Sequence, residues 1–299
     1  MVTERDLSWY RPPVAVDLPL ETASFQGCIA CGRALVPRRV GVNRMLICRQ
    51  CGMGQVQGDP MMEAYWTQSD PDAVLAEVYW EARRTMFEAA LRHLAKEPGR
   101  RLLDLGGGVG HFAEIALAQG WDAFSTDLSP LAVEAAAARL GPERSLLGTT
   151  MESHAGTFDV VTLWCVVAHV ADPVALLREA ARMLVPGGRV LVTTPNFLFQ
   201  KTYARLLNRL GRPLEFARED HLLSFTPKAL TRVAAQAGFE QPSFHYFGVT
   251  EECVARRSLG TALVPLKRTW NAAGARAQMV GLPPLGGELQ FIARRAQPS

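Results

Sequence analysis

The stretch Arg101-Leu-Leu-Asp-Leu-Gly-Gly-Gly-Val-Gly-His-Phe112 decides the fold of this chain. It begins with a short apolar run and continues into a glycine-rich turn, and apolar residues return at helical spacing from Phe112 to Ala118. The pattern predicts a strand, a tight loop and a helix. Glycines let the backbone of such a loop approach a ligand closely, and the N-terminus of the helix points at the same place. We therefore expect a nucleotide-like ligand at this loop.

The spacing of the glycines narrows the kind of ligand. A dinucleotide-binding fingerprint requires a glycine where this chain has His111, whereas here an acidic residue, Asp104, stands two positions before the first glycine. The resulting Asp-x-Gly-x-Gly-x-Gly pattern resembles that of class I S-adenosylmethionine (SAM) dependent methyltransferases. The resemblance implies that Asp104, Gly106, Gly108 and Gly110 hold the methionine and ribose parts of SAM. The alternative is a strand-to-helix turn in some other α/β protein.

Further cofactor contacts are expected along the chain. A second strand over 121–126 ends at Asp127, whose carboxylate can accept hydrogen bonds from two ribose hydroxyls; a helix-terminus charge is the alternative. On the helix before the first strand, Tyr79 or Arg83 either touches the SAM carboxylate or belongs to a face that packs on the sheet. The resemblance adds four cofactor-binding residues, Leu128, Thr150, Met151 and Trp164.

Later segments point to a subgroup. The ubiquinone-biosynthesis O-methyltransferases have phrases similar to Phe158-Asp-Val-Val161, His169-Val-Ala-Asp-Pro173, Leu184-Val-Pro-Gly-Gly188 and His221-Leu-Leu-Ser-Phe-Thr-Pro227. That subgroup usually has Glu-His where this chain has Ala168-His169, so no acid–base role of the glutamate carries over. We interpret His169 either as a base on the substrate side or as an anchor of its loop. His221 either takes a proton from the acceptor or orients the segment that follows it.

The resemblance also implies the fold class, an α/β protein with a doubly wound, seven-stranded, mostly parallel sheet of the Rossmann-like methyltransferase type. We expect the fifth strand over 189–193, after a turn at 186–188. A sixth strand over 243–247 and a terminal strand over 288–294 then form an antiparallel pair at the edge of the sheet, joined by a mostly helical connection over 255–277.

An insertion of about residues 195–225 separates the fifth strand from the next helix and is longer than a typical crossover. Its amphipathic part, 197–210, has basic residues on one side and apolar residues on the other. We interpret the insertion as a lid over the acceptor pocket, with Asn196 and Tyr203 as substrate-binding residues. Binding to a membrane surface is the alternative, and an ordinary solvated face would carry the same charges.

The N-terminal part contains two cysteine pairs, Cys28-Ile-Ala-Cys31 and Cys48-Arg-Gln-Cys51. Two C-x2-C turns supply the four thiolates of a tetrahedral zinc site, and the intervening 40–47 suits a short hairpin, so this segment resembles a zinc ribbon. A redox dithiol is the alternative. A site closed by four thiolates has no open position for a substrate, so we expect the zinc to be structural.

Length and composition limit the possible domain organisation, partners and cellular compartment. The chain has 299 residues, 48% of them hydrophobic, which is enough for a substantial core. We expect an N-terminal segment with the zinc ribbon over 1–58 and the methyltransferase domain over 59–299. A net charge of +3 does not by itself call for nucleic acid. No apolar run reaches the roughly 20 residues that span a bilayer, and no signal-peptide pattern is present, so we expect a cytoplasmic protein.

These observations favour a SAM-dependent methyltransferase acting on a small-molecule acceptor, such as a secondary metabolite or sugar derivative, at oxygen, nitrogen or carbon. An RNA methyltransferase is the alternative, because five arginines make the ribbon basic: Arg33, Arg38, Arg39, Arg44 and Arg49. A third hypothesis is a non-catalytic interaction protein with the same fold. Failure to bind SAM would favour it.

Overall fold

The computed structural model of the protein describes residues 27–40, 43–55, 83–148, 152–209, 211, 221–248 and 286–297. Its α-helices are α3 (Arg84–Leu94), α4 (His111–Ala118), α5 (Pro130–Leu140), α6 (Pro173–Met183), α7 (Phe197–Arg209) and α8 (Pro227–Gln236). Two short 3-10 helices are η1 (Pro142–Arg144) and η2 (Glu152–His154). Within these residues, no helix is long and apolar enough to cross a membrane.

Three of the helices begin in the same way. Asp172 and the hydroxyl residues Ser129 and Thr226 each accept a hydrogen bond from a backbone N–H in the first turn of the helix that follows, and a proline comes next. A side-chain cap satisfies a donor that the helix leaves unpaired, and proline at the first helical position has no N–H to leave unpaired. The sequence therefore defines where α5, α6 and α8 start.

A seven-stranded sheet forms the centre of the molecule, in the order β10-β11-β8-β7-β4-β5-β6. β11 runs antiparallel to both of its neighbours, whereas β4 to β8 run parallel to one another. This arrangement confirms the predicted doubly wound, mostly parallel sheet. The strands are β4 (Arg101–Leu105), β5 (Asp122–Asp127), β6 (Ser145–Leu147), β7 (Phe158–Trp164), β8 (Leu184–Pro195), β10 (Phe239–Phe244) and β11 (Glu288–Arg295).

Two strands differ from the sequence prediction. The sixth strand lies over Phe239–Phe244 instead of 243–247, because Gly238 ends α8 in a left-handed conformation and the chain enters the sheet at once. An edge strand tolerates Pro242 because one side of it needs no ladder hydrogen bonds. The fifth strand begins at Leu184, so the predicted turn at 186–188 lies inside β8, where the pairing with β7 is irregular. The connection predicted over 255–277 lies outside the described residues.

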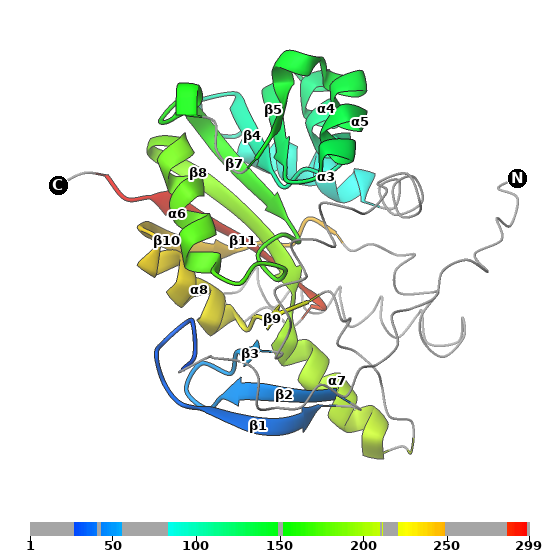
Figure 1. Ribbon diagram of the computed structural model, residues 1–299, viewed down its shortest axis with the longest axis vertical. Coiled ribbons are helices and arrows are strands. Elements are labelled where there is room, and N and C mark those ends of the chain that lie inside the picture. Colours follow the sequence, from blue (N-terminus) through cyan, green and yellow to red (C-terminus); the bar gives the residue numbers. More distant parts are fainter. Residues whose placement is uncertain are drawn as a thin grey trace, which may run out of the picture.

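The two faces of the sheet have separate apolar cores. Figure 1 shows α3, α4 and α5 on one face and α6 and α8 on the other. Phe87 and Phe112 are fully buried in the first core, and Leu177 and Leu230 in the second. Because the parallel strands all end at the same edge, this packing leaves that edge to the loops that follow β4, β5 and β7, where open α/β sheets bind ligands.

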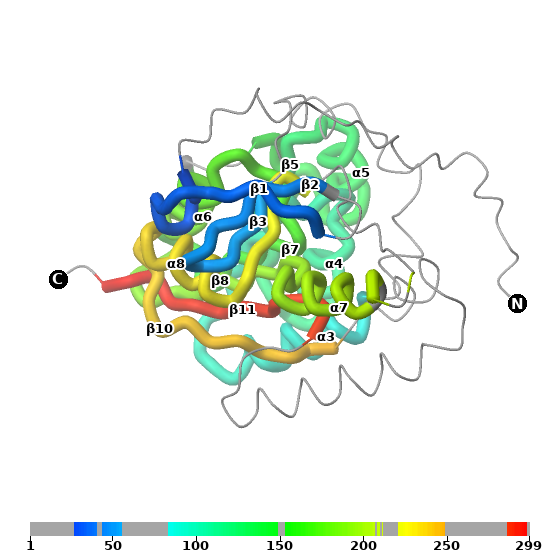
Figure 2. Tube along the Cα trace, turned by 90° about the horizontal axis from the view of Figure 1, so that it is seen from below, coloured from blue at the N-terminus to red at the C-terminus, as the bar shows by residue number. Residues whose placement is uncertain are grey.

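A second, smaller sheet contains the N-terminal segment. Its order is β1-β2-β3-β9, made of β1 (Leu35–Val40), β2 (Asn43–Cys48), β3 (Gly54–Gln55) and β9 (Leu223–Ser224). β1 and β2 form a hairpin that is longer than the one predicted over 40–47, because its first strand already begins at Leu35. The fourth strand, β9, comes from the far end of the insertion, and Figure 2 shows β1, β2, β3 and β9 together beside α7 and α8. The predicted domain boundary at 58/59 lies outside the described residues and stays a prediction.

Candidate cofactor and metal sites

The glycine loop between β4 and α4 has the conformation that its sequence requires. Gly106, Gly108 and Gly110 have φ angles of 74°, 55° and 83°, which side-chain-bearing residues rarely adopt. A Cβ on Gly106 would lie 2.7 Å from Cγ2 of Val166, whereas a Cβ on Gly108 would meet no atom of the described residues within 4 Å. Gly108 therefore presents bare backbone to open space at the edge of the sheet, where a ligand can approach.

Asp127 closes this loop from the end of β5. Its Oδ2 accepts a hydrogen bond from the N–H of Gly108 and its Oδ1 from that of Ser129, both at 2.9 Å. Each carboxylate oxygen has a second lone pair, so the half-buried group retains acceptor capacity for a ligand. The next residue, Leu128, is an exposed hydrophobic side chain, with 39% of its surface accessible.

Asp104 lies behind the loop instead of on its open side. It is only 1% exposed, its Oδ1 accepts a hydrogen bond from Thr162 Oγ1 at 2.7 Å, and a Cβ on Gly107 would lie 2.7 Å from its Oδ2. Burial raises the pKa of this carboxyl to about 7, and the charge of Asp127 adds to the rise, while the Thr162 hydrogen bond opposes it. In this position Asp104 supports the loop from within the sheet.

Trp164, at the end of β7, belongs to an aromatic group under the loop. Its ring packs 4.6 Å from that of Phe87 and 4.9 Å from that of Phe112, measured between centroids. Its Nε1 is buried and has no hydrogen-bond partner among the described residues. Thr150 and Met151, also predicted to bind cofactor, lie outside the described residues, as does Tyr79.

A polar cluster that the sequence did not reveal as a group lies next to Trp164. Cys165 has a φ of 62°, unusual for a residue with a side chain, and its Sγ lies 3.4 Å from Arg83 Nη2 and 3.7 Å from Glu288 Oε1. Arg83 and Glu288 form a buried ion pair at 3.8 Å. A strained residue beside a buried ion pair at the ligand-binding edge of a sheet is a feature of functional sites. Only Arg83 had a sequence signal.

The two predicted base candidates come together although 52 positions separate His169 from His221. Their rings stack with centroids 4.5 Å apart and planes inclined by 30°. Both are half-buried, and the N–H of Leu223 donates to the carbonyl of Ala168 at 3.0 Å, which ties the two segments together.

Of the two predicted substrate residues, Asn196 directly precedes α7 and Tyr203 lies in the middle of that helix. Asn196 is fully buried; its Nδ2 donates to the carbonyl of Gly286 at 2.9 Å and its Oδ1 accepts from the N–H of Leu198 at 3.1 Å. These contacts join α7 to the chain entering β11. The ring of Tyr203 stacks on Phe199, with centroids 5.9 Å apart.

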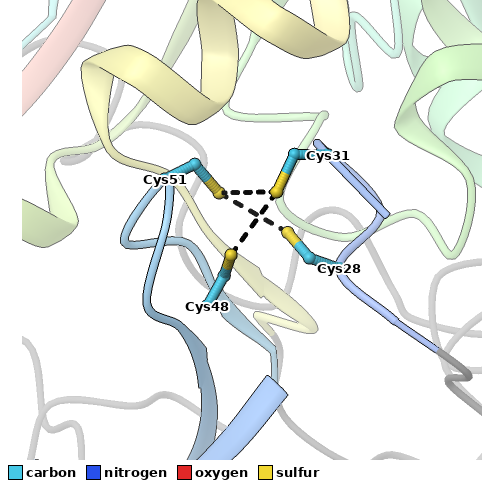
Figure 3. A group of neighbouring side chains, drawn as sticks. All are labelled: Cys28, Cys31, Cys48 and Cys51. Atoms are coloured by element: carbon cyan, nitrogen blue, oxygen red, sulfur yellow. Dashed lines mark hydrogen bonds between the residues drawn. The ribbon is translucent and has the colours of Figure 1, made fainter. Parts of the chain in front are cut away.

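The four cysteines form one cluster, with sulfurs that point toward a common centre (Figure 3) and lie within 4.8 Å of one another. The Sγ atoms of Cys28 and Cys51 are 3.5 Å apart, those of Cys31 and Cys48 3.4 Å, and those of Cys31 and Cys51 3.8 Å. Sulfurs bound tetrahedrally at about 2.3 Å from zinc would lie about 3.8 Å apart. These contacts cross between the two pairs, which suits one shared metal ion better than a dithiol within either pair.

The backbone of each cysteine pair forms the turn that such a site needs. Gly32 and Gly52 follow the pairs with φ angles of 67° and 75°, and their N–H groups donate to the carbonyls of Cys28 and Cys48. The contact with Cys51 raises the pKa of Cys28, and the same contact lowers that of Cys51 to about 5. Soft thiolate donors in this number and arrangement fit zinc.

Comparison with known proteins agrees with this geometry. A family model described as a methyltransferase domain matches residues 79–241, which is more than half of the chain. The chain belongs to this methyltransferase family. With its glycine loop and seven-stranded sheet, the protein is a SAM-dependent methyltransferase.

Two curated relatives match about half of the chain each, and a solved structure aligns with about three quarters of it. The ubiquinone biosynthesis O-methyltransferase of Psychrobacter arcticus is 31% identical over 172 residues, which are 51% of this chain and 65% of that protein. The enzyme of the same name from Aliivibrio fischeri is 31% identical over 168 residues, 51% of this chain and 70% of its own. A Thermotoga maritima methyltransferase structure, titled a possible histamine N-methyltransferase, aligns at 17% identity and a TM-score of 0.45, covering 73% of this chain and 92% of its own.

Proposed function

We propose that this methyltransferase transfers the methyl group of SAM to an oxygen of a small-molecule acceptor. The observation that carries the proposal is the open backbone at Gly108, held against the carboxylate of Asp127. The names of the two relatives, both O-methyltransferases of ubiquinone biosynthesis, support a small acceptor and oxygen as the methylated atom.

The cofactor side is assigned from the contacts around the loop. Asp127 accepts hydrogen bonds from the ribose hydroxyls through the lone pairs that Gly108 and Ser129 do not use, and Leu128 packs on the adenine. Arg83 pairs with the carboxylate of the methionine part. Asp104 acts through the loop, because its own carboxyl is buried beneath Gly107.

The acceptor side lies where β7 and β8 end. Bound SAM supplies a methyl group activated by a sulfonium leaving group, so the protein mainly aligns the two reactants and removes a proton from the acceptor where one is present. The stacked pair of His169 and His221 takes this proton. Tyr203 lines the acceptor pocket from α7, and Asn196 fixes the start of that helix.

We also propose that the four cysteines bind one structural zinc ion. The cross-pair sulfur distances of 3.4 to 3.8 Å and the soft donor set support zinc. Metal analysis of protein purified without chelator should give about one zinc per chain, and Cys48→Ser should lose it. Retention of zinc by that variant would contradict the assignment.

RNA as the acceptor is the second candidate, because the cysteine segment is strongly basic. No Asp or Glu occurs between residues 22 and 58. The segment has five arginines, and all of them are exposed: Arg33, Arg38, Arg39, Arg44 and Arg49. Phosphate contacts by such residues would make binding strongly dependent on salt.

One experiment separates the candidates. Wild-type protein and Asp127→Ala are incubated with SAM and either a panel of hydroxylated aromatic compounds and sugars or a structured RNA, and formation of S-adenosylhomocysteine is measured by mass spectrometry. Product from a small hydroxylated compound with the wild type alone supports the proposal. Product only with RNA, lost as salt is raised, would replace it with the second candidate.

A further inference from the structure

The cysteine cluster and the proposed acceptor side share one sheet. β3 begins three residues after Cys51, and β9 begins two residues after His221. These two short strands pair in antiparallel fashion, Gly54 with Ser224 and Gln55 with Leu223. The segment that carries His221 is therefore an edge strand of the cysteine sheet.

Hydrogen bonds join the second cysteine turn to both helices that flank this segment. Thr226 Oγ1 donates to the carbonyl of Cys51 at 2.5 Å while it accepts from the N–H of Ala229 at the start of α8. Lys201 Nζ, from α7, donates to the carbonyl of Gly52 at 3.3 Å. The carbonyl groups of two consecutive residues in one metal-binding turn thus hold two different helices.

Apolar packing also joins α7 to the cysteine sheet. Phe197, at the start of α7, is 1% exposed and lies in a small core with Val40 and Met45 of the cysteine hairpin. A Cβ on Gly54 would lie 2.8 Å from its ring, so the ring rests directly on the backbone of β3. Not every apolar residue of this amphipathic helix is buried, because Leu206 is 54% exposed.

Among the described residues, the hydrogen bonds of the glycine loop are made with β5 and not with the cysteine sheet. Gly106 and Gly107 donate to the carbonyl of Thr126, and Gly108 donates to Asp127, so the loop is held by β5. None of the hydrogen bonds between described residues joins this loop to the cysteine sheet. The cofactor side and the acceptor side therefore have different mechanical supports.

We propose that the metal-bound cysteine turn positions the acceptor side of the enzyme, namely α7 and the His221–Leu223 segment, through Lys201 and Thr226. Thiolates fixed on a metal fix the carbonyls of Cys51 and Gly52, and these carbonyls fix the two helices. Lys201 and Thr226 are positioning residues. The functional meaning of the inference rests on the assignment of His221 and α7 to the acceptor, but the mechanical coupling does not.

The test compares zinc-loaded full-length protein with the same protein after removal of zinc by a chelator, with zinc content measured in each sample. Amide hydrogen exchange is followed by mass spectrometry, and the ring signals of 13C-labelled histidines by NMR. Without zinc we expect exchange in α7 and at Leu223 to accelerate at least tenfold and the His169 and His221 signals to shift. The exchange rates in α4 and β5 and the dissociation constant of SAM should change less than twofold. The His93 and His245 signals should keep their positions.

Variants keep the inference falsifiable if removal of zinc unfolds the protein. Lys201→Met removes both the hydrogen bond to Gly52 and the ammonium group, which lies 4.8 Å from the centroid of the Phe197 ring, but keeps an unbranched side chain. Thr226→Ser retains both hydrogen bonds of the hydroxyl. In zinc-loaded Lys201→Met we expect faster exchange in α7 and shifted His221 signals at unchanged zinc content. Thr226→Ser should behave like the wild type, as should Lys228→Met, which removes an exposed charge from α8.

The possible results have separate meanings. Equal behaviour of Lys201→Met and Lys228→Met would overturn the inference, as would zinc removal that changes either no histidine or all histidines alike. A protein that shows the coupling but does not bind SAM would refute the proposed function and leave the inference standing.

Discussion

The carboxyl group of Asp104 offers a quantitative test of how the cofactor loop is built. The side chain is 1% exposed, and burial raises its pKa from 3.8 to about 7. Between these values the folded protein keeps a proton that the unfolded chain has lost, so this group makes the protein less stable as pH rises through that window. A shift of this size corresponds to about 4 kcal/mol, as an order of magnitude.

Replacing Asp104 by Asn removes the titration and keeps an oxygen that can accept the hydrogen bond from Thr162 Oγ1, which is 2.7 Å long in the wild type. The variant should gain stability relative to the wild type as pH rises from 5 to 8, by up to a few kcal/mol. Urea unfolding of zinc-loaded protein at pH 5, 6, 7 and 8 measures this difference. A difference that does not grow with pH would refute the buried, protonated carboxyl.

The same variant distinguishes two roles for Asp104 in cofactor binding. If the carboxyl supports the loop from behind, as its contact with Gly107 indicates, Asp104→Asn should change the dissociation constant of SAM less than threefold at pH 7. If its charge contacted the ammonium group of SAM, the loss would be about tenfold or more, because hydrogen bonds to charged groups are worth about 1.5–3 kcal/mol. Calorimetric titration gives the answer directly.

Three other predictions concern the loop, the core and pH. Gly106→Ala should abolish SAM binding and destabilise the fold, because a Cβ would lie 2.7 Å from Val166. Gly108→Ala, whose Cβ would meet no atom of the described residues, should cost only about 1–3 kcal/mol of backbone strain. Equal effects of the two variants in thermal unfolding would refute the loop geometry. Phe112→Ala should lower the free energy of unfolding by about 3–5 kcal/mol, measured in urea, and a loss below 1 kcal/mol would contradict its full burial. Burial lowers the pKa of His245 to about 4, so the contribution of the neutral ring to stability is present above pH 6.5 and is lost as pH falls toward 4. In His245→Gln the free energy of unfolding should therefore fall less steeply over this pH range. An unchanged pH dependence would contradict this assignment.

Local signals in the sequence were sufficient for much of the fold. The apolar run before Gly106 predicted β4, the helical spacing from Phe112 to Ala118 predicted α4, and a capping side chain followed by proline marks the start of α5, α6 and α8. These elements obey rules that act within a few residues. The sixth strand did not, because its place depends on pairing with β11, a partner from the far end of the chain.

The site was predictable where it follows a loop motif and not where it depends on distant contacts. Asp127 and the four cysteines follow from spacing alone. The stacking of His169 on His221, the ion pair of Arg83 with Glu288 and the pairing of β3 with β9 join segments far apart in the chain. No periodicity within one segment encodes such contacts, so only the folded structure reveals them.

The measurement that tests the account most directly is calorimetric titration of SAM into the wild-type protein, Asp127→Ala and Glu134→Gln, which removes an exposed carboxylate from α5. We expect micromolar binding by the wild type and Glu134→Gln. For Asp127→Ala we expect binding weaker by about tenfold to a hundredfold, the cost of about 1.5–3 kcal/mol in charge-assisted hydrogen bonds. Absence of SAM binding by the wild type, or equal binding by all three proteins, would contradict the assignment of this edge of the sheet as the cofactor site.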